Sequence, residues 1–200
     1  MLSLFAFTVG TLAAALHSDP DGQSLARRIR AGDRDAFRTF FDRHHERLIG
    51  YVTGRGIPPE VAEDIVQNAF LYIWDNRDKI EPDQSLRAYL FRIGYTRALN
   101  HVRDAASVDP DVEPSNPRDL RFASSGSNPS SDVISAEVRE QIDAAIASLP
   151  ERRRAVFELC FLQDLTYQEA AEALDITRKT VENHMGLALR DLRDRLGDDG

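Results

Sequence analysis

Residues 165–195 read LTYQEAAEALDITRKTVENHMGLALRDLRDR, and their spacing predicts two helices joined by a tight turn. Thr166 can cap the first helix, because its hydroxyl can accept a hydrogen bond from the amide of Glu169 while the Glu169 side chain reaches back. Asp175 holds the turn, where Asp tolerates the left-handed backbone better than most residues. The stretch therefore predicts a helix-turn-helix, the motif whose second helix enters the major groove of DNA.

The second helix of this motif follows Thr177, which can cap it, and presents a polar surface at its N-terminal end. Val181, Met185 and Leu189 recur at a four-residue step and form its inward side. The residues left facing outward are Arg178, Lys179, Thr180, Glu182, Asn183 and His184. Such side chains contact base edges and phosphates, so we expect them to read DNA. An ordinary helical hairpin with a solvated face is the alternative interpretation.

The composition predicts an all-α fold and only local contact with nucleic acid. Strand signals are almost absent from the 200 residues, because no long alternating run occurs. The net charge of −8 argues against a protein coated in nucleic acid, so a few helix faces must make any DNA contact. Cys160 lies in an apolar run, which predicts a buried thiol and fits a reducing cytoplasm.

The first sixteen residues carry no charge. A signal peptide would have Lys or Arg before its apolar run, and a membrane-spanning helix needs about twenty apolar residues. We therefore expect residues 1–23 to form an apolar or disordered N-terminal extension, with weak membrane association as the alternative.

Residues 24–104 predict a first helical bundle, which contains the adjacent pair His44 and His45. Neighbouring residues on a helix point in different directions, and no carboxylate–histidine frame surrounds this pair. We therefore expect no metal site and no cofactor. Residues 60–74 combine apolar stripes with an exposed face that carries Asp64, Gln67 and Asn68.

A further helix begins at Ser85, which can cap it, and carries a polar stripe beside aromatic residues. Arg92, Thr96, Asn100 and Arg103 share one side of this helix, and Tyr95 lies on the neighbouring apolar stripe. Cations for phosphates and flat aromatic faces for unstacked bases are what single-stranded DNA requires. The stripe thus favours contact with melted DNA over simple solvation.

Residues 105–134 differ from both flanking segments. The run AASVDPDVEPSNPRDLRFASSGSNPSSD contains four prolines and many serines, which is typical of a flexible linker. Its 28 residues can span on the order of 90 Å when stretched. We expect two small helical bundles, residues 24–104 and 135–196, that need not touch.

The order of these motifs resembles the extracytoplasmic-function (ECF) group of bacterial RNA polymerase sigma factors. The strings GDRDAFRTFFDRHH, AEDIVQNAFLYIW and SLRAYLFRIGYTRALNHVR are similar to region 2, and residues 148–196 are similar to region 4. TVENH and RALNHVR are most similar to the iron-citrate-uptake branch of the group.

The resemblance implies a role for each candidate residue. Asp64, Gln67 and Asn68 would dock on the β′ clamp of core RNA polymerase, and region 4 would meet the β flap. Arg92, Tyr95, Thr96, Asn100 and Arg103 would contact the melted −10 promoter element. The outward residues of helix 178–190 would read the −35 element. An anti-sigma factor is a further expected partner, and neither a small-molecule substrate nor an enzymatic activity is expected.

The main rival is a transcriptional regulator with a LuxR-type helix-turn-helix, which acts without being a polymerase subunit and also carries TVxNH-like strings. Such regulators have a receiver or ligand domain in front. Residues 1–104 lack the alternating strands of a receiver, so the sequence favours the sigma factor.

Overall fold

The computed structural model describes residues 20–108 and 136–197, and these residues form helices without a strand. The helices are α2 (Pro20–Arg30), α3 (Arg34–Thr53), α4 (Pro59–Asp75), η1 (Arg77–Lys79), α5 (Leu86–Val108), α6 (Ala136–Ala147), α7 (Glu151–Phe157), η4 (Glu158–Leu162), α8 (Tyr167–Leu174) and α9 (Arg178–Gly197). The all-α prediction is confirmed. The predictions for residues 1–19 and for the linker beyond Val108 lie outside the described residues.

Helices α2 to α5 form the first group, which we call the N-terminal module. Helices α3, α4 and α5 pack against one another, and the rings of Phe40 and Phe70 meet nearly edge-on with centroids 5.8 Å apart. Asp33 caps α3 by accepting hydrogen bonds from the amides of Asp35 and Ala36. Helix α2 begins at Pro20, inside the segment expected to be an extension, because Leu25, Ala26 and Ile29 are buried in this core.

Helices α6 to α9 form the second group, the C-terminal module. Its chain widens into a π-turn at η4, between α7 and the loop that leads to α8. Cys160 is buried as predicted, together with Val156 and Leu159, but Leu162 is 39% exposed. Leu162 faces outward because the π-turn rotates the residues after Glu158 away from α-helical spacing.

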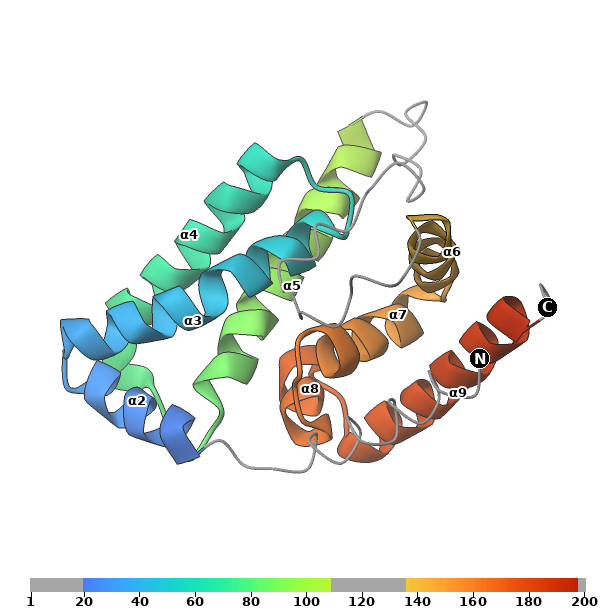
Figure 1. The fold of residues 1–200 in the computed structure, drawn as a ribbon. Coiled ribbons are helices and arrows are strands. Elements are labelled where there is room, and N and C mark those ends of the chain that lie inside the picture. Colours follow the sequence, from blue (N-terminus) through green and yellow to red (C-terminus); the bar gives the residue numbers. More distant parts are fainter. Residues whose placement is uncertain (1–19, 109–135, 198–200) are drawn as a thin grey trace.

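The two modules pack together, although the sequence suggested that they need not touch (Figure 1). Helix α5 lies between the remaining helices of its own module and α8, whose buried Ala170, Ala171 and Ala173 permit a close approach. The buried side chains of both modules form one continuous cluster. The seam between the modules is therefore part of the hydrophobic core.

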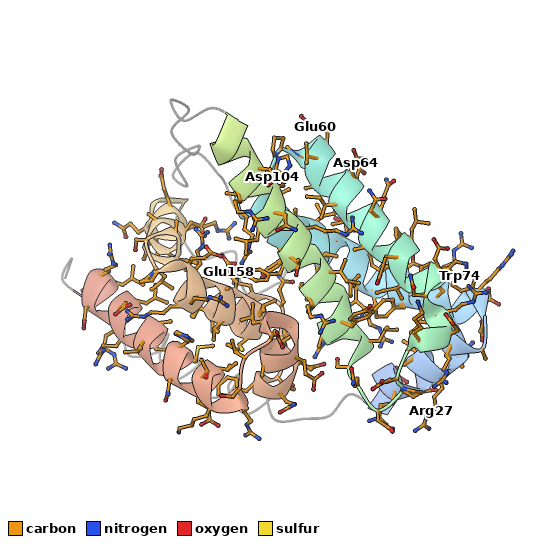
Figure 2. The ribbon with its side chains drawn as sticks, turned by 180° about the vertical axis from the view of Figure 1, so that it is seen from behind. Arg27, Glu60, Asp64, Trp74, Asp104 and Glu158 are labelled. Carbon is orange, nitrogen blue, oxygen red and sulfur yellow. The ribbon has the colours of Figure 1, made fainter. Side chains whose placement is uncertain are left out.

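A charged pair is buried in this seam. The Arg55 guanidinium lies 2.8 Å from the Glu158 carboxylate, and both side chains are less than 5% exposed. Figure 2 shows Glu158 near the middle of the molecule, between the two modules. Arg55 also lies over the Tyr51 ring, 3.9 Å from its centroid. A buried charge that loses its partner is strongly destabilising. The pair therefore favours this one position of the two modules relative to each other.

Candidate nucleic-acid interface

The helix-turn-helix has the local geometry that its sequence predicts. The amide of Glu169 donates to the Thr166 hydroxyl at 3.1 Å, and the amide of Thr166 donates to the Glu169 carboxylate at 2.9 Å. Asp175 adopts the left-handed conformation with φ 53°. The amide of Thr180 donates to the Thr177 hydroxyl, which caps α9. The predicted capping box, turn and second cap are confirmed.

The N-terminal end of α9 exposes half of the predicted base-reading residues to solvent. Arg178, Lys179 and Asn183 are exposed, whereas Thr180, Glu182 and His184 are half-buried. Glu182 lies 3.4 Å from Arg178 and 3.2 Å from Lys179. This carboxylate holds the two cations side by side at the helix end, where DNA would meet them.

The stripe on α5 divides into exposed and buried members. Arg92, Thr96, Asn100 and Arg103 are exposed, and Arg103 donates to the Asn100 side chain at 3.1 Å. Tyr95 is only 7% exposed and its ring lies 5.5 Å from the Arg55 guanidinium. In this arrangement the structure does not bring Tyr95 onto the surface with the other four.

Two other tyrosines supply aromatic faces beside the stripe. Tyr72 and Tyr89 line a depression of about 200 Å³ together with Arg92, Ile93, Thr96 and Arg97. The Arg92 guanidinium lies 5.3 Å from the centroid of the Tyr89 ring. Tyr89 precedes Arg92 by three residues and Thr96 by seven, so helical spacing could have placed it on this face. Tyr72 comes from α4, and no local pattern in the sequence joins it to α5.

Helix α4 presents its predicted polar face on the outside of the molecule. Asp64, Gln67 and Asn68 are exposed, and Figure 2 shows Asp64 pointing away from the neighbouring helices. The opposite side buries Val66 and Phe70. The three polar residues are therefore available to a partner.

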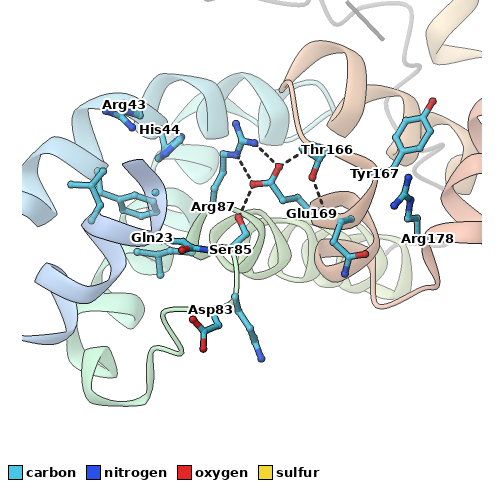
Figure 3. A pocket seen from close by; sticks show the side chains of 16 residues that line it. Gln23, Arg43, His44, Asp83, Ser85, Arg87, Thr166, Tyr167, Glu169 and Arg178 are labelled. Carbon is cyan, nitrogen blue, oxygen red and sulfur yellow. Dashed lines mark hydrogen bonds and ion pairs between the residues drawn. The ribbon is translucent and has the colours of Figure 1, made fainter. Parts of the chain in front are cut away.

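A pocket of about 250 Å³ lies at the seam, between the loop that precedes α5 and the first turns of α8 and α9. Figure 3 shows the Glu169 carboxylate at its centre, with bonds to Arg87, Ser85 and Thr166. Burial raises the pKa of Glu169, but hydrogen bonds and charge from Arg87, then hydrogen bonds from Ser85 and Thr166, outweigh it and lower the pKa. Glu169 is thus an ionised group held by the opposite module, a role that its place in the capping box gave no reason to expect.

His44 lies beneath this pocket and is buried. Burial, followed by the charges of Arg87, Arg43 and Arg47, lowers its pKa to about 3 despite the opposing charge of Glu169. The imidazole is therefore neutral at physiological pH. Within residues 20–108 and 136–197 no group of three His, Cys, Asp or Glu side chains is placed to hold a metal ion.

Two further properties of the described residues bear on the expected chemistry. Cys160 is buried, which raises the pKa of its thiol to about 12 and makes it a poor nucleophile. No helix in the described part of the chain has the length and apolar character needed to cross a membrane.

Comparison with known families and proteins accounts for both modules. The model of sigma-70 region 2 matches residues 40–108, and the model of sigma-70 region 4 matches residues 139–192. The ECF RNA polymerase sigma-E factor of Escherichia coli (strain K12) is 31% identical over 173 residues, which cover 82% of this chain and 87% of that protein. The ECF RNA polymerase sigma factor SigK of Mycobacterium tuberculosis (strain ATCC 25618 / H37Rv) is 28% identical over 187 residues, which cover 90% and 95%.

Solved structures show the same arrangement of helices. CnrH, solved in complex with the cytosolic domain of CnrY, superposes with a TM-score of 0.64 at 26% identity and covers 90% of this chain and 99% of its own. The sigma factor RpoE of Bartonella quintana, solved with the anti-sigma factor NepR, superposes with a TM-score of 0.62 at 20% identity and covers 82% and 98%. The second likeness supports the fold alone.

Proposed function

Because this chain belongs to the ECF group of RNA polymerase sigma factors, an alternative sigma factor family that directs transcription initiation, we propose a role for each exposed face. The face of α4 that carries Asp64, Gln67 and Asn68 docks on the β′ clamp of core polymerase, and the C-terminal module meets the β flap. The N-terminal end of α9 reads the −35 element. The stripe on α5 holds the melted −10 element.

One observation carries this assignment. A single chain presents a recognition helix with exposed cations at its N-terminal end and, on the other module, an acidic and amide face on α4 that is unsuited to DNA. A carboxylate surface repels phosphates, so α4 fits a protein partner better than a nucleic acid. The chain thus acts as an initiation factor bound to polymerase rather than as an enzyme.

Four of the five residues proposed to contact the −10 element are exposed in this structure, and the fifth is buried. Arg92, Thr96, Asn100 and Arg103 can meet phosphates directly, whereas Tyr95 would need the modules to separate first. We add Tyr72 and Tyr89 as aromatic faces for unstacked bases, because they line the depression beside Arg92 and Thr96.

We also propose a branch of the ECF group, a protein partner and a cellular compartment for this chain. TVENH at residues 180–184 and RALNHVR at residues 97–103 support the iron-citrate-uptake branch. An anti-sigma factor is a proposed partner, since the sigma factor RpoE of Bartonella quintana, which shares this fold, was solved bound to the anti-sigma factor NepR. We propose that the chain acts in the cytoplasm, where core polymerase and promoters meet.

Transcription from a promoter library tests the function directly. The chain is mixed with core RNA polymerase and a library of promoter sequences, and the transcripts are sequenced. We expect initiation from templates that share a two-element motif, and none from core alone. Failure to associate with core, or initiation without a shared motif, would contradict the proposal.

Point variants separate the two modules in the same assay. Arg178→Ala or Asn183→Ala should weaken the −35 preference about tenfold and leave core binding intact, because each removes a contact to DNA. Asp64→Ala or Gln67→Ala should weaken core binding and leave the −35 preference. Arg190→Ala on α9 and Asp75→Ala on α4 are exposed matched controls. Loss of both activities in every variant would count against two separate faces.

A further inference from the structure

The Glu169 carboxylate is held as a phosphate would be held. The Arg87 guanidinium donates through Nη2 to one carboxylate oxygen at 2.5 Å and through Nε to the other at 3.2 Å. The Ser85 hydroxyl donates to the second oxygen at 2.7 Å. A guanidinium fork with a neighbouring hydroxyl is a recurring way for proteins to bind an oxyanion, and it suits phosphate as well as carboxylate.

One of the two donors, Ser85, lies where a DNA strand on the α5 stripe would arrive. Counting along the helix, Ser85 precedes Arg92 by seven residues and Thr96 by eleven, so the three share one side of α5. The site also lies at the N-terminal end of this long helix, where the exposed amides and the helix dipole favour an anion. A strand that follows the stripe from Arg103 toward the start of α5 therefore reaches Ser85 next. Arg87 lies two positions later, on the other side of the helix, but its guanidinium reaches the same Glu169 carboxylate as the Ser85 hydroxyl.

The carboxylate comes from the other module and from its DNA-reading part. Glu169 belongs to the first helix of the helix-turn-helix, and Arg178 of the recognition helix lines the same pocket as Arg87 (Figure 3). The −10 and −35 elements are roughly 80 Å apart at about 3.4 Å per base pair. The packed arrangement cannot place both modules on their elements at once.

We propose that Ser85 and Arg87 bind a backbone phosphate of the melted promoter strand, and that Glu169 occupies the position of that phosphate while the modules are packed together. This inference rests on the proposed function of the α5 stripe. Strand binding and packing of the modules then compete for the same two donors. The C-terminal module inhibits strand binding until polymerase separates the modules.

Phosphate scanning of the promoter strand tests the site. Holoenzyme assembled from the full chain and core polymerase is bound to forked promoter DNA with a single-stranded −10 segment. Phosphates are replaced one at a time by neutral methylphosphonates. Wild-type holoenzyme should lose about tenfold in affinity at one phosphate near the upstream end of the −10 segment, as expected when a charged hydrogen bond is lost.

Variants identify which residues hold that phosphate. Arg87→Gln should bind unmodified DNA about tenfold more weakly, lose nothing more from that one methylphosphonate, and show a salt slope reduced by about 0.7. Ser85→Ala should lose less affinity than wild type when the same phosphate is replaced by a methylphosphonate. Arg87→Lys should bind unmodified DNA more tightly than Arg87→Gln. Equal sensitivity of wild type and Arg87→Gln at every phosphate would overturn the site.

A second arm uses the full chain without polymerase. Glu169→Gln keeps a capping-box side chain but removes the charge that holds Arg87, so it should bind single-stranded −10 DNA several-fold more tightly than wild type. Arg47→Gln is the matched control, because it breaks another ion pair between the modules, Arg47 to Asp164 at 3.2 Å, away from Ser85 and Arg87. Equal gains in both variants would mean that Glu169 only bridges the modules and would overturn the competition.

The two levels of the proposal fail differently. If wild-type protein and core do not initiate transcription, the proposed function fails. If they initiate normally and no phosphate couples to Arg87, only the phosphate site fails.

Discussion

At the scale of single residues, His44 gives the protein a defined response to acid. Its side chain is 5% exposed, and its ring centroid lies 4.8 Å from that of Phe40. Because the pKa is about 3 when folded and about 6.5 when unfolded, the neutral imidazole contributes full stability above pH 6.5. That contribution falls as the pH drops from 6.5 toward 3, because the unfolded chain takes up the proton first.

Replacing this imidazole should remove part of the acid sensitivity. Between pH 7 and pH 5 the wild type should lose about 2 kcal/mol of unfolding free energy through His44, and His44→Gln should lack this loss. Urea unfolding of both proteins at the two pH values measures the difference. An identical pH dependence in His44→Gln would contradict the assignment.

Residue-level prediction from the sequence succeeded where the signal was local. Thr166, Glu169 and Asp175 took the predicted cap and turn positions because caps and turns depend on residues within a few positions of each other. The charged residues Arg55 and Glu158 carried no such signal. The two residues are 103 positions apart in the chain. Nothing in the sequence around either one distinguishes a buried charge from a solvated one.

At the scale of elements, the crossing of α5 over α3 depends on a glycine. A Cβ added at Gly94 would lie 2.7 Å from Cδ1 of Leu48, whereas a Cβ added at Gly186 on α9 would meet nothing within 4 Å. Both residues lie inside helices. Alanine at Gly186 would change only the helix propensity, whereas alanine at Gly94 would also crowd Leu48. Comparing the two substitutions therefore separates these two contributions to stability.

Alanine at these two glycines should change stability in opposite directions. Gly186→Ala should raise the unfolding free energy by up to about 1 kcal/mol through helix propensity. Gly94→Ala should lower it by about 1 kcal/mol, since overpacking of roughly 1–3 kcal/mol exceeds that gain. Adding Leu48→Val to Gly94→Ala should recover part of the loss. Chemical denaturation measures all three, and equal stabilisation at both glycines would show that α3 and α5 adjust freely.

The helices themselves were largely predictable, because apolar periodicity fixes which face of each is buried. The exceptions have physical causes. Leu162 faces outward because of the π-turn at η4. Of the two tyrosines beside Arg92, Tyr89 lies on the same helix but Tyr72 comes from α4. Periodicity describes one helix at a time and carries no information on which helices meet.

At the scale of the whole molecule, the two modules form one packed body. The seam combines a continuous apolar cluster with ion pairs that join Arg55 to Glu158, Arg87 to Glu169 and Arg47 to Asp164. The sequence suggested modules that need not touch, because the linker between them is long enough to hold them apart. A promoter-bound sigma factor needs its modules apart, so this packed body is the state that must open.

The distance between the modules in the free and promoter-bound states tests this most directly. Dyes are attached at Asp42→Cys on α3 and Gln168→Cys on α8, two exposed positions. Arg43, the residue after Asp42, and Gln168 itself line one pocket, so energy transfer in the free chain should be high. With core polymerase and promoter DNA the transfer should fall to a low value, as the modules move to elements roughly 80 Å apart. High transfer in complexes that are actively initiating transcription would contradict the separation.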